Sequence, residues 1–222
     1  MQFLYHSSSG DPLLEIEGET YKYLFRVRRM KQGSLIETRN LRDGMLYIYR
    51  VQSVGKREAL LELVSSQESS VIPLKSLHIG WCIIDPKVVE KSLPALNEIG
   101  VAKITFIKCA YSQANFKIKK ERLEKILINS SQQCGRSSIM QIEFANSLYE
   151  FLQNNPESYL LDFSENRVSQ SGDIETIVVG CEGGLSEDER ALFDSKKRVG
   201  FDTPLILRSE SAAVAVAAKT LL

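Results

Sequence analysis

The chain has 222 residues, of which 43% are apolar and 25% are charged, and its 28 Lys and Arg balance its 28 Asp and Glu. This composition is typical of a globular domain and excludes collagen-like, coiled-coil and disordered chains. No stretch approaches the ~20 apolar residues that a membrane-spanning helix requires. The first residues lack the pattern of a signal peptide, so we expect a cytoplasmic protein with no membrane association.

The charges are mixed along the whole chain. Residues 1–70 carry 10 basic and 9 acidic residues, and the remainder is slightly acidic. Neither part is a polycation, so any nucleic-acid binding must depend on local basic patches.

The cysteines and histidines offer little reactive chemistry. The four cysteines have no CxxC spacing, so we predict no metal site and interpret them as reduced, mostly buried thiols. They are Cys82, Cys109, Cys134 and Cys181. The two histidines, His6 before a turn and His78 in an apolar run, are interpreted as structural. A Ser-His-Asp triad is therefore not expected.

The first seventy residues predict a small β-barrel. Short apolar stretches at 33–38, 45–51 and 59–64 are separated by turn-forming residues, a spacing typical of such barrels. The polar stretch 65–70, ended by Pro73, is predicted to be a linker. We therefore predict one domain at residues 1–70 and a second at 71–222.

The second part alternates between strand and helix patterns, which predicts a parallel α/β sheet with ligands at the carboxyl ends of its strands. The expected strands are 77–84, 103–109, 158–163, 176–181 and 198–201, and the expected helices are 88–99 (interrupted by Pro94), 119–134, 148–153, 186–193 and 209–222.

A glycine turn at 178–186 gives the strongest local signal. A strand leads into Gly180, Glu182, Gly183 and Gly184, and a helix with a Ser186/Glu189 capping box follows. The pattern is neither a P-loop nor a dinucleotide fingerprint. The negative charge of Glu182 favours a ligand with hydroxyls or a positive charge, such as a ribose or a sulfonium. The alternative is a strand–turn–helix connection without a ligand.

A second candidate lies at 203–212, where an irregular apolar segment leads into a helix. Ser209 is the expected N-cap, and Arg208 and Glu210 flank it at the mouth of the sheet. The alternative is simple capping with an ordinary salt bridge.

Two further stretches are candidates for nucleic-acid binding. Residues 21–31 carry five cations and three aromatic residues but no acid, which suits phosphates and stacked bases. A solvated basic face over core aromatics is the alternative. Gln133 and Arg136, near the end of the expected helix 119–134, are able to read a base edge or to cap the helix.

Taken in order, these pieces resemble one family, the RsmE-type 16S ribosomal RNA uracil-N3 methyltransferases of the SPOUT class. The last two of the matching stretches are specific and the others are supportive. In chain order they are Arg26–Gly33 (RVRRMKQG), Glu98–Val101 (EIGV), Gln132–Arg136 (QQCGR), Gly180–Ser186 (GCEGGLS) and Leu207–Ala212 (LRSESA).

The resemblance implies an α+β chain of two domains, a PUA/OB-like RNA-binding barrel and an α/β domain with a C-terminal trefoil knot. It implies a homodimer that binds S-adenosyl-L-methionine and methylates N3 of a uridine in 16S rRNA of the small ribosomal subunit. The implied cofactor residues are Leu161, Gly180, Glu182, Gly183, Gly184, Thr203, Leu205, Leu207, Arg208 and Ser209. The implied RNA-binding residues are Arg26, Arg28, Arg29, Lys31, Gln133 and Arg136.

For catalysis, the chemistry requires positioning and stabilisation of a developing uracil anion, for which Arg136 or Arg208 is suited. Glu210 would orient Arg208 or accept a proton. The chain departs from the family pattern at Cys181, Gln132, Tyr111 and Asp202–Thr203.

Three other functions remain open at this point. One is another SPOUT enzyme that methylates a ribose 2′-hydroxyl or a guanine. The second is a non-catalytic RNA-binding protein, which the retained glycine and Arg208 motifs disfavour. The third is a nicotinamide dehydrogenase, which the missing Gly-x-Gly-x-x-Gly disfavours.

Overall fold

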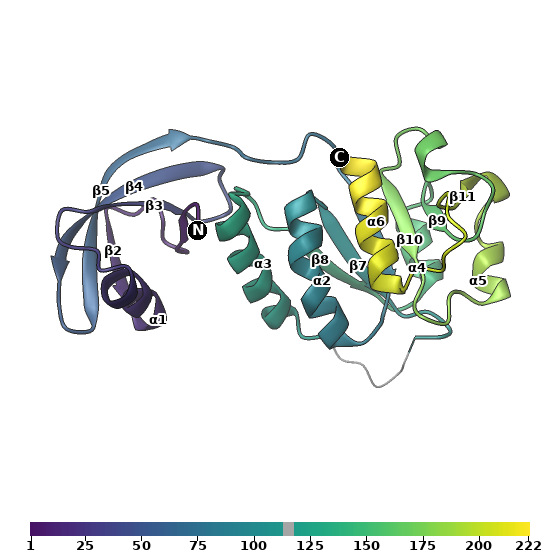
Figure 1. Ribbon diagram of the computed structural model, residues 1–222, viewed down its shortest axis with the longest axis horizontal. Coiled ribbons are helices and arrows are strands. Elements are labelled where there is room, and N and C mark those ends of the chain that lie inside the picture. The colour runs from purple at the N-terminus through teal and green to yellow at the C-terminus, as the bar shows by residue number, and fades with distance from the viewer. Residues whose placement is uncertain (113–117) are drawn as a thin grey trace. The chain divides into compact units, whose positions relative to one another are not determined.

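The computed structural model describes residues 1–112 and 118–222, which form two compact units. The first unit comprises residues 1–72 together with 128–139, and the second comprises 73–127 and 140–222 (Figure 1). The division passes through one helix, α3 (Lys120–Cys134). No pattern in the sequence predicts that residues 128–139 belong with the N-terminal unit.

The first unit contains a five-stranded sheet in the order β1-β3-β4-β5-β2. The β1–β3 pair is parallel and the other pairs are antiparallel. A helical turn, α1 (Gly18–Tyr21) followed by the π-helix Lys22–Val27, connects β2 to β3. The strands are β1 (Leu4–Tyr5), β2 (Leu13–Glu17), β3 (Leu35–Arg39), β4 (Met45–Val54) and β5 (Glu58–Glu68).

Alternation of apolar and polar residues builds the core of this unit. In β2, Leu14 and Ile16 are buried while their neighbours are exposed, as a strand with one solvated face requires. Leu24 and Phe25 of the π-helix join the same core. The predicted linker at 65–70 is wrong for most of its length, because Ser65–Glu68 belong to β5 and pair with β4. Polar residues can form this part of β5 because hydrogen bonds between the backbones of β4 and β5, and not the burial of side chains, hold the two strands together there.

The second unit contains a six-stranded parallel sheet in the order β11-β9-β10-β6-β7-β8. The predicted parallel α/β sheet is therefore confirmed. One strand, β8, was not predicted, because it is an edge strand in which only Ile142 is buried and no apolar run marks it. The strands are β6 (His78–Cys82), β7 (Lys103–Ile107), β8 (Gln141–Ala145), β9 (Tyr159–Leu161), β10 (Thr176–Val179) and β11 (Arg198–Val199).

The helices of this unit mostly follow the predicted periodicity. One of them, α2 (Pro86–Ile99), starts after the N-cap Asp85, is capped by Gly100 in the left-handed conformation and runs unbroken through Pro94, where an interruption was predicted. Figure 1 shows α2 and α6 (Ser209–Leu221) side by side over the sheet. The other elements are α4 (Leu148–Asn154), α5 (Glu187–Ala191) and the 3-10 turns Val168–Gln170 and Ser195–Lys197. No helix in the described residues is long and apolar enough to span a membrane.

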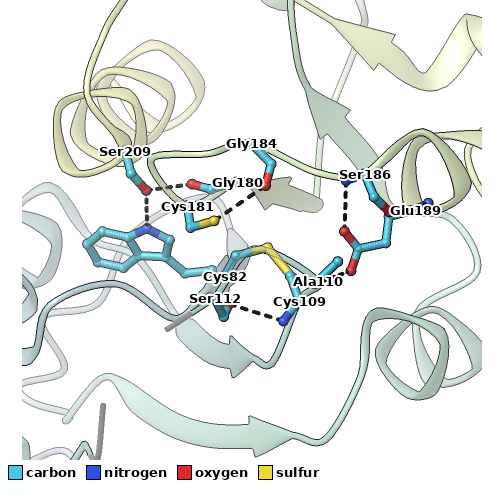
Figure 2. The surroundings of a disulfide bond; sticks show 11 residues. Cys82, Cys109, Ala110, Ser112, Gly180, Cys181, Gly184, Ser186, Glu189 and Ser209 are labelled. Atoms are coloured by element: carbon cyan, nitrogen blue, oxygen red, sulfur yellow. Dashed lines mark hydrogen bonds between the residues drawn. A yellow bond between two sulfur atoms is a disulfide. The ribbon is translucent and has the colours of Figure 1, made fainter. Parts of the chain in front are cut away.

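The interpretation of the four cysteines as reduced thiols is wrong for two of them, since Cys82 and Cys109 form a disulfide (Figure 2). Cys82 ends β6 and Cys109 follows the neighbouring strand β7. Parallel pairing brings their Cα atoms to 5.8 Å, within the range that a disulfide spans. Cys181 and Cys134 are free, and only Cys134 is exposed.

Candidate active site

A cavity of about 670 Å³ lies in the second unit, where strands β9 and β10 end. Three segments contribute to its lining: 160–167, from the end of β9 onward; 179–190, from the end of β10 onward; and 201–212, which leads into α6 and includes its first turn. The cavity therefore occupies the carboxyl edge of the parallel sheet, where ligands of open α/β folds bind.

The glycine segment, residues 180–184, closes on itself through its backbone. An ideal Cβ on Gly180 would lie 3.2 Å from the Cα of Gly184, and the Gly184 N–H donates to the carbonyl of Cys181 at 2.9 Å. Gly184 adopts a positive φ of 72°, which favours glycine. The close backbone approach, rather than flexibility, therefore explains these glycines.

Gly183 has a different neighbour. A Cβ at this position would lie 3.1 Å from the Cβ of Tyr111, in the segment that follows β7. A side chain there would press on Tyr111 first. The segment after β7 therefore supports the outer side of the glycine segment.

The glycine segment ends at the predicted capping box, which is confirmed. The Ser186 hydroxyl accepts from the Glu189 N–H at 3.2 Å, and the Glu189 carboxylate accepts from the Ser186 N–H at 3.0 Å. The other oxygen of Glu189 accepts from the Ala110 N–H at 2.8 Å (Figure 2). One carboxylate thus joins α5 to the segment after β7.

Ser209 joins the third segment to the glycine segment and to β6. The prediction that Ser209 is the N-cap of α6 is wrong: α6 begins at Ser209, and Arg208 is the N-cap without a side-chain bond. The Ser209 hydroxyl instead donates to the Gly180 carbonyl at 2.5 Å and accepts from the indole N–H of Trp81 at 2.9 Å. Figure 2 shows Ser209 directed at Gly180. A buried hydroxyl with two tertiary partners is unavailable for capping.

Charged side chains line the cavity beside the glycines. Arg190 of α5 forms an ion pair with Asp162, which follows β9, at 3.4 Å, and its Nε donates to the carbonyl of Leu185 at 3.2 Å. The sequence patterns did not single out Arg190 or Asp162, because the two residues lie 28 positions apart and neither stands in a recognisable motif. They also did not single out Phe163, which is exposed in the same lining.

The ten residues implied as cofactor contacts all line this one cavity. Ser209 is buried, whereas Glu182, Thr203, Leu205 and Arg208 are exposed. The full set is Leu161, Gly180, Glu182, Gly183, Gly184, Thr203, Leu205, Leu207, Arg208 and Ser209. Residues far apart in the sequence are thus brought to one place.

The three residues proposed for catalysis are not brought together in the same way. Arg208 lines the cavity, whereas Glu210 is half-buried in the first turn of α6 and is not part of the lining. No ion pair between Arg208 and Glu210 is present, although both lie in the described part of the chain. Arg136 belongs to the first unit and is buried, and burial lowers the pKa of its guanidinium.

The basic segment, residues 21–31, surrounds the π-helix of the first unit. Arg26 lies over the ring of Tyr21 and Arg28 over that of Tyr23, at 5.7 and 5.6 Å from the ring centroids. Tyr21 is buried in the core, whereas Tyr23 is partly exposed. The alternative of a basic face over core aromatics therefore holds for Tyr21, whereas Tyr23 has an accessible ring, and nucleic-acid binding by the segment stays a prediction.

The four cations predicted to bind RNA in this segment, Arg26, Arg28, Arg29 and Lys31, are all exposed. Arg29 has a positive φ of 57°, an uncommon conformation for a residue other than glycine. The Met30 N–H donates to the Leu24 carbonyl at 3.0 Å, so this conformation ends the helical turn. Gln133, the other predicted RNA contact, is exposed near the end of α3.

Two further groups, His78 and Cys181, are held in unreactive states. Burial, together with the charge of Lys103, lowers the pKa of His78 to about 4, and its Nε2 lies 2.8 Å from the hydroxyl of Thr105. Burial raises the pKa of the Cys181 thiol, which disfavours the nucleophilic thiolate. His78 is thus a structural residue, as predicted. In the described residues no group of three His, Cys, Asp or Glu is placed to hold a metal ion.

Comparison with known proteins assigns the two units. Residues 71–221 match the model of an RNA methyltransferase domain, and residues 16–64 match that of an RNA methyltransferase PUA domain. Ribosomal RNA small subunit methyltransferase E of Helicobacter pylori is 41% identical over 221 residues, which cover 98% of both chains. The enzyme of the same name from Aquifex aeolicus is 28% identical and covers 93% of both chains.

Solved structures agree with the fold. A methyltransferase from Legionella pneumophila in complex with its bound cofactor SAM is 25% identical, with a TM-score of 0.80 over 98% of this chain and 96% of that one. Ribosomal RNA small subunit methyltransferase E of Neisseria gonorrhoeae bound to S-adenosyl methionine shares the fold, with a TM-score of 0.81 at 17% identity over 98% and 95% of the two chains. Together, the PUA-like domain, the parallel α/β sheet and these matches show that the chain belongs to the RNA methyltransferase family, as a member of the ribosomal RNA small subunit methyltransferase E group.

Proposed function

We propose that this RNA methyltransferase transfers a methyl group from S-adenosyl-L-methionine to N3 of a uridine in 16S rRNA of the small ribosomal subunit. The observation that carries the proposal is the cavity at the ends of β9 and β10, which gathers all ten implied cofactor residues. The small-subunit substrate rests on the names of the curated relatives.

The cavity suits the proposed cofactor in size and lining. Its volume of about 670 Å³ lies in the range of pockets that enclose molecules of this size. The backbone of Gly180–Gly184 and the apolar side chains of Leu161, Leu205 and Leu207 form much of its wall. Glu182 at the rim is suited to hydroxyls or to a positive charge and disfavours a phosphate. The SAM-bound relative from Legionella pneumophila supports this assignment.

The bound cofactor would supply the methyl group on a sulfonium, and the chain must position a uracil nitrogen in line with it. As N3 loses its proton, negative charge develops on the ring. Arg208 is exposed on the lining of the cavity, where its guanidinium can stabilise that charge. It also stands at the N-terminus of α6, whose 13 residues contribute a favourable dipole. The role implied for Glu210, to orient Arg208 or to accept the proton, stays a prediction, because in the part of the chain that the structure describes Glu210 neither lines the cavity nor pairs with Arg208.

We assign RNA docking to the first unit. Its match to an RNA methyltransferase PUA domain and the exposed cations of the basic segment support this role. Tyr23 offers a partly exposed ring for stacking. Arg136 is buried outside the cavity lining, so its part in RNA binding or catalysis stays a prediction.

The proposal also includes a homodimer, a trefoil knot and a location in the cytoplasm. A homodimer would cover the exposed apolar side chains of Leu205 and Ile206 beside the cavity. The trefoil knot stays a prediction for the segment that leads into α6. A ribosomal substrate would place the enzyme in the cytoplasm.

The test is the position of the methyl mark. Small-subunit particles from a strain lacking the enzyme are incubated with the purified protein and labelled S-adenosyl-L-methionine. We then expect label in 3-methyluridine after digestion of the rRNA to nucleosides. Label in a 2′-O-methylated nucleoside or in a methylguanosine would overturn the proposed target atom, and absence of transfer with RNA binding intact would support a non-catalytic RNA-binding protein.

A further inference from the structure

Two adjacent residues of α5 reach opposite sides of the glycine segment. Glu189 bonds to the segment after β7, through the Ala110 N–H at 2.8 Å. Arg190 bonds to the segment after β9, through the Asp162 carboxylate at 3.4 Å. One short helix thus links the ends of three strands, β7, β9 and β10, around the cavity.

Both partners of α5 are themselves held in place. Ala110 follows Cys109, whose disulfide to Cys82 fixes the ends of β6 and β7 to each other (Figure 2). The Asp162 N–H donates to the carbonyl of Val199 at 2.8 Å, which holds the segment after β9 to β11. The two links therefore transmit the position of the rigid sheet to the glycine segment.

The guanidinium of Arg190 makes two contacts on the cavity wall: it pairs with Asp162 at 3.4 Å and donates to the Leu185 carbonyl at 3.2 Å. It also lies beside Gly184, where a side chain would meet it, since an added Cβ would be 3.4 Å from its Nη2. The side chain of Asp162 is only 13% exposed and that of Arg190 39%, so solvent screens the pair incompletely. The planar guanidinium of Arg190 donates to both partners at once, whereas the single ammonium of a lysine would not reproduce this geometry.

We propose that Arg190, with Asp162 as its partner, is a positioning residue for the cofactor that sets the distance between the first two segments of the cavity. Glu189 plays the corresponding part on the side of β7. This inference rests on the proposed function, because it takes S-adenosyl-L-methionine as the ligand. Loss of the pair would let residues 162–167 move away from the glycine segment and widen the cavity.

A simple electrostatic role for these charges predicts a different pattern. If only charge near a cationic sulfonium mattered, removal of the Arg190 charge would tighten binding and removal of the Asp162 charge would weaken it. If the pair sets geometry, both changes weaken binding. S-adenosyl-L-homocysteine, whose sulfur is neutral, adds a second criterion, since geometry affects both ligands equally and charge affects mainly the sulfonium.

The experiment measures the affinity of full-length Arg190→Met and Asp162→Asn proteins for both ligands by calorimetry. We expect about fivefold to tenfold weaker binding in each variant, with similar losses for the two ligands. Arg190→Lys should recover part of the loss. In methylation assays the KM for S-adenosyl-L-methionine should rise while kcat at saturation stays within about twofold of wild type.

Glu157→Gln is the matched control. Glu157 pairs with Lys197 at 2.7 Å in the same unit, and neither residue lines the cavity, so cofactor affinity should not change. Thermal unfolding without ligand checks that each variant is folded. If Arg190→Met does not fold, the comparison is made with Asp162→Asn alone.

The outcomes separate the two proposals. Wild-type protein that binds neither ligand would overturn the proposed function. Wild-type binding with unchanged affinity in folded Arg190→Met and Asp162→Asn would overturn the positioning role alone. Tighter binding by Arg190→Met, confined to the sulfonium, would replace it with a purely electrostatic role.

Discussion

The cavity and the basic segment depend on different features of the chain: the shape of the backbone in the first, and exposed side-chain charge in the second. The cavity depends on backbone turns at strand ends, where Gly180 and Gly184 approach so closely that a Cβ on Gly180 would lie 3.2 Å from the Cα of Gly184 and force the backbone to shift. The basic segment depends on exposed cations around a π-helix, whose backbone is fixed by the buried Leu24 and Phe25. Shape dominates in the first region and charge in the second.

This difference predicts how each region responds to change. A substitution in the glycine segment should act in an all-or-none way, because close-packed backbone cannot yield by small steps. Removal of a cation from the basic segment should act gradually and depend on salt.

The largest effect is expected at Gly183. Replacement by Val should abolish measurable binding of S-adenosyl-L-methionine in calorimetry, because the new side chain would press on Tyr111, 3.1 Å from the position of its Cβ. A second change, Tyr111→Gly, should restore part of the affinity. Failure of this rescue would mean that the side chain fills the space of the ligand itself, and unchanged affinity in Gly183→Val would contradict the assignment of the glycine segment.

Arg208→Ala should lower turnover about 100-fold to 1000-fold while cofactor affinity falls much less, because the guanidinium acts on charge that develops in the transition state. Single-turnover methylation at saturating cofactor measures the effect. If turnover at saturation is intact and only cofactor affinity falls, Arg208 is a cofactor contact without a catalytic role.

Acid should destabilise the sheet of the second unit through His78. Its pKa is about 4 in the folded state, below the ordinary value of 6.5, so the unfolded state binds the proton first. The resulting stability is complete above pH 6.5 and is lost as pH falls toward 4, a change of about 3 kcal/mol. Urea unfolding between pH 7.5 and 4.5 should show this slope, and His78→Gln should flatten it. An equal slope in both proteins would assign the loss to carboxylates instead.

The smallest effect is expected in the basic segment. Arg26→Ala, Arg28→Ala and Arg29→Gly together should weaken RNA binding about tenfold and reduce its salt dependence by about two to three units of slope. Glycine is chosen at position 29 because it adopts the positive φ of 57° without strain. Cofactor affinity should not change. RNA affinity and salt dependence equal to wild type would contradict RNA docking by this segment.

Local patterns predicted much of the second unit. The alternation of strand and helix, the capping box of Ser186 and Glu189, and the structural role of His78 all depend on nearby residues or on burial, and the structure confirms them. The family resemblance, carried mainly by Gly180–Ser186 and Leu207–Ala212, is confirmed by the matches over nearly the whole chain.

Contacts between distant segments were missed. The Cys82–Cys109 disulfide follows from the pairing of β6 with β7, which no spacing of cysteines reveals. The sequence places Ser209 at a helix start, but its bonds to Trp81 and Gly180 depend on how three segments meet. The Arg190–Asp162 pair is hidden for the same reason, because charged residues outside a motif give no sign of their partners.

Calorimetry of the full-length wild-type protein with S-adenosyl-L-methionine and, in a parallel titration, with NAD tests whether this cavity is the cofactor site. The cavity lined by the glycine segment and by residues 201–212 predicts saturable binding of S-adenosyl-L-methionine, displaced by S-adenosyl-L-homocysteine, and no binding of NAD. Binding of NAD without binding of S-adenosyl-L-methionine, or binding of neither, would contradict the account.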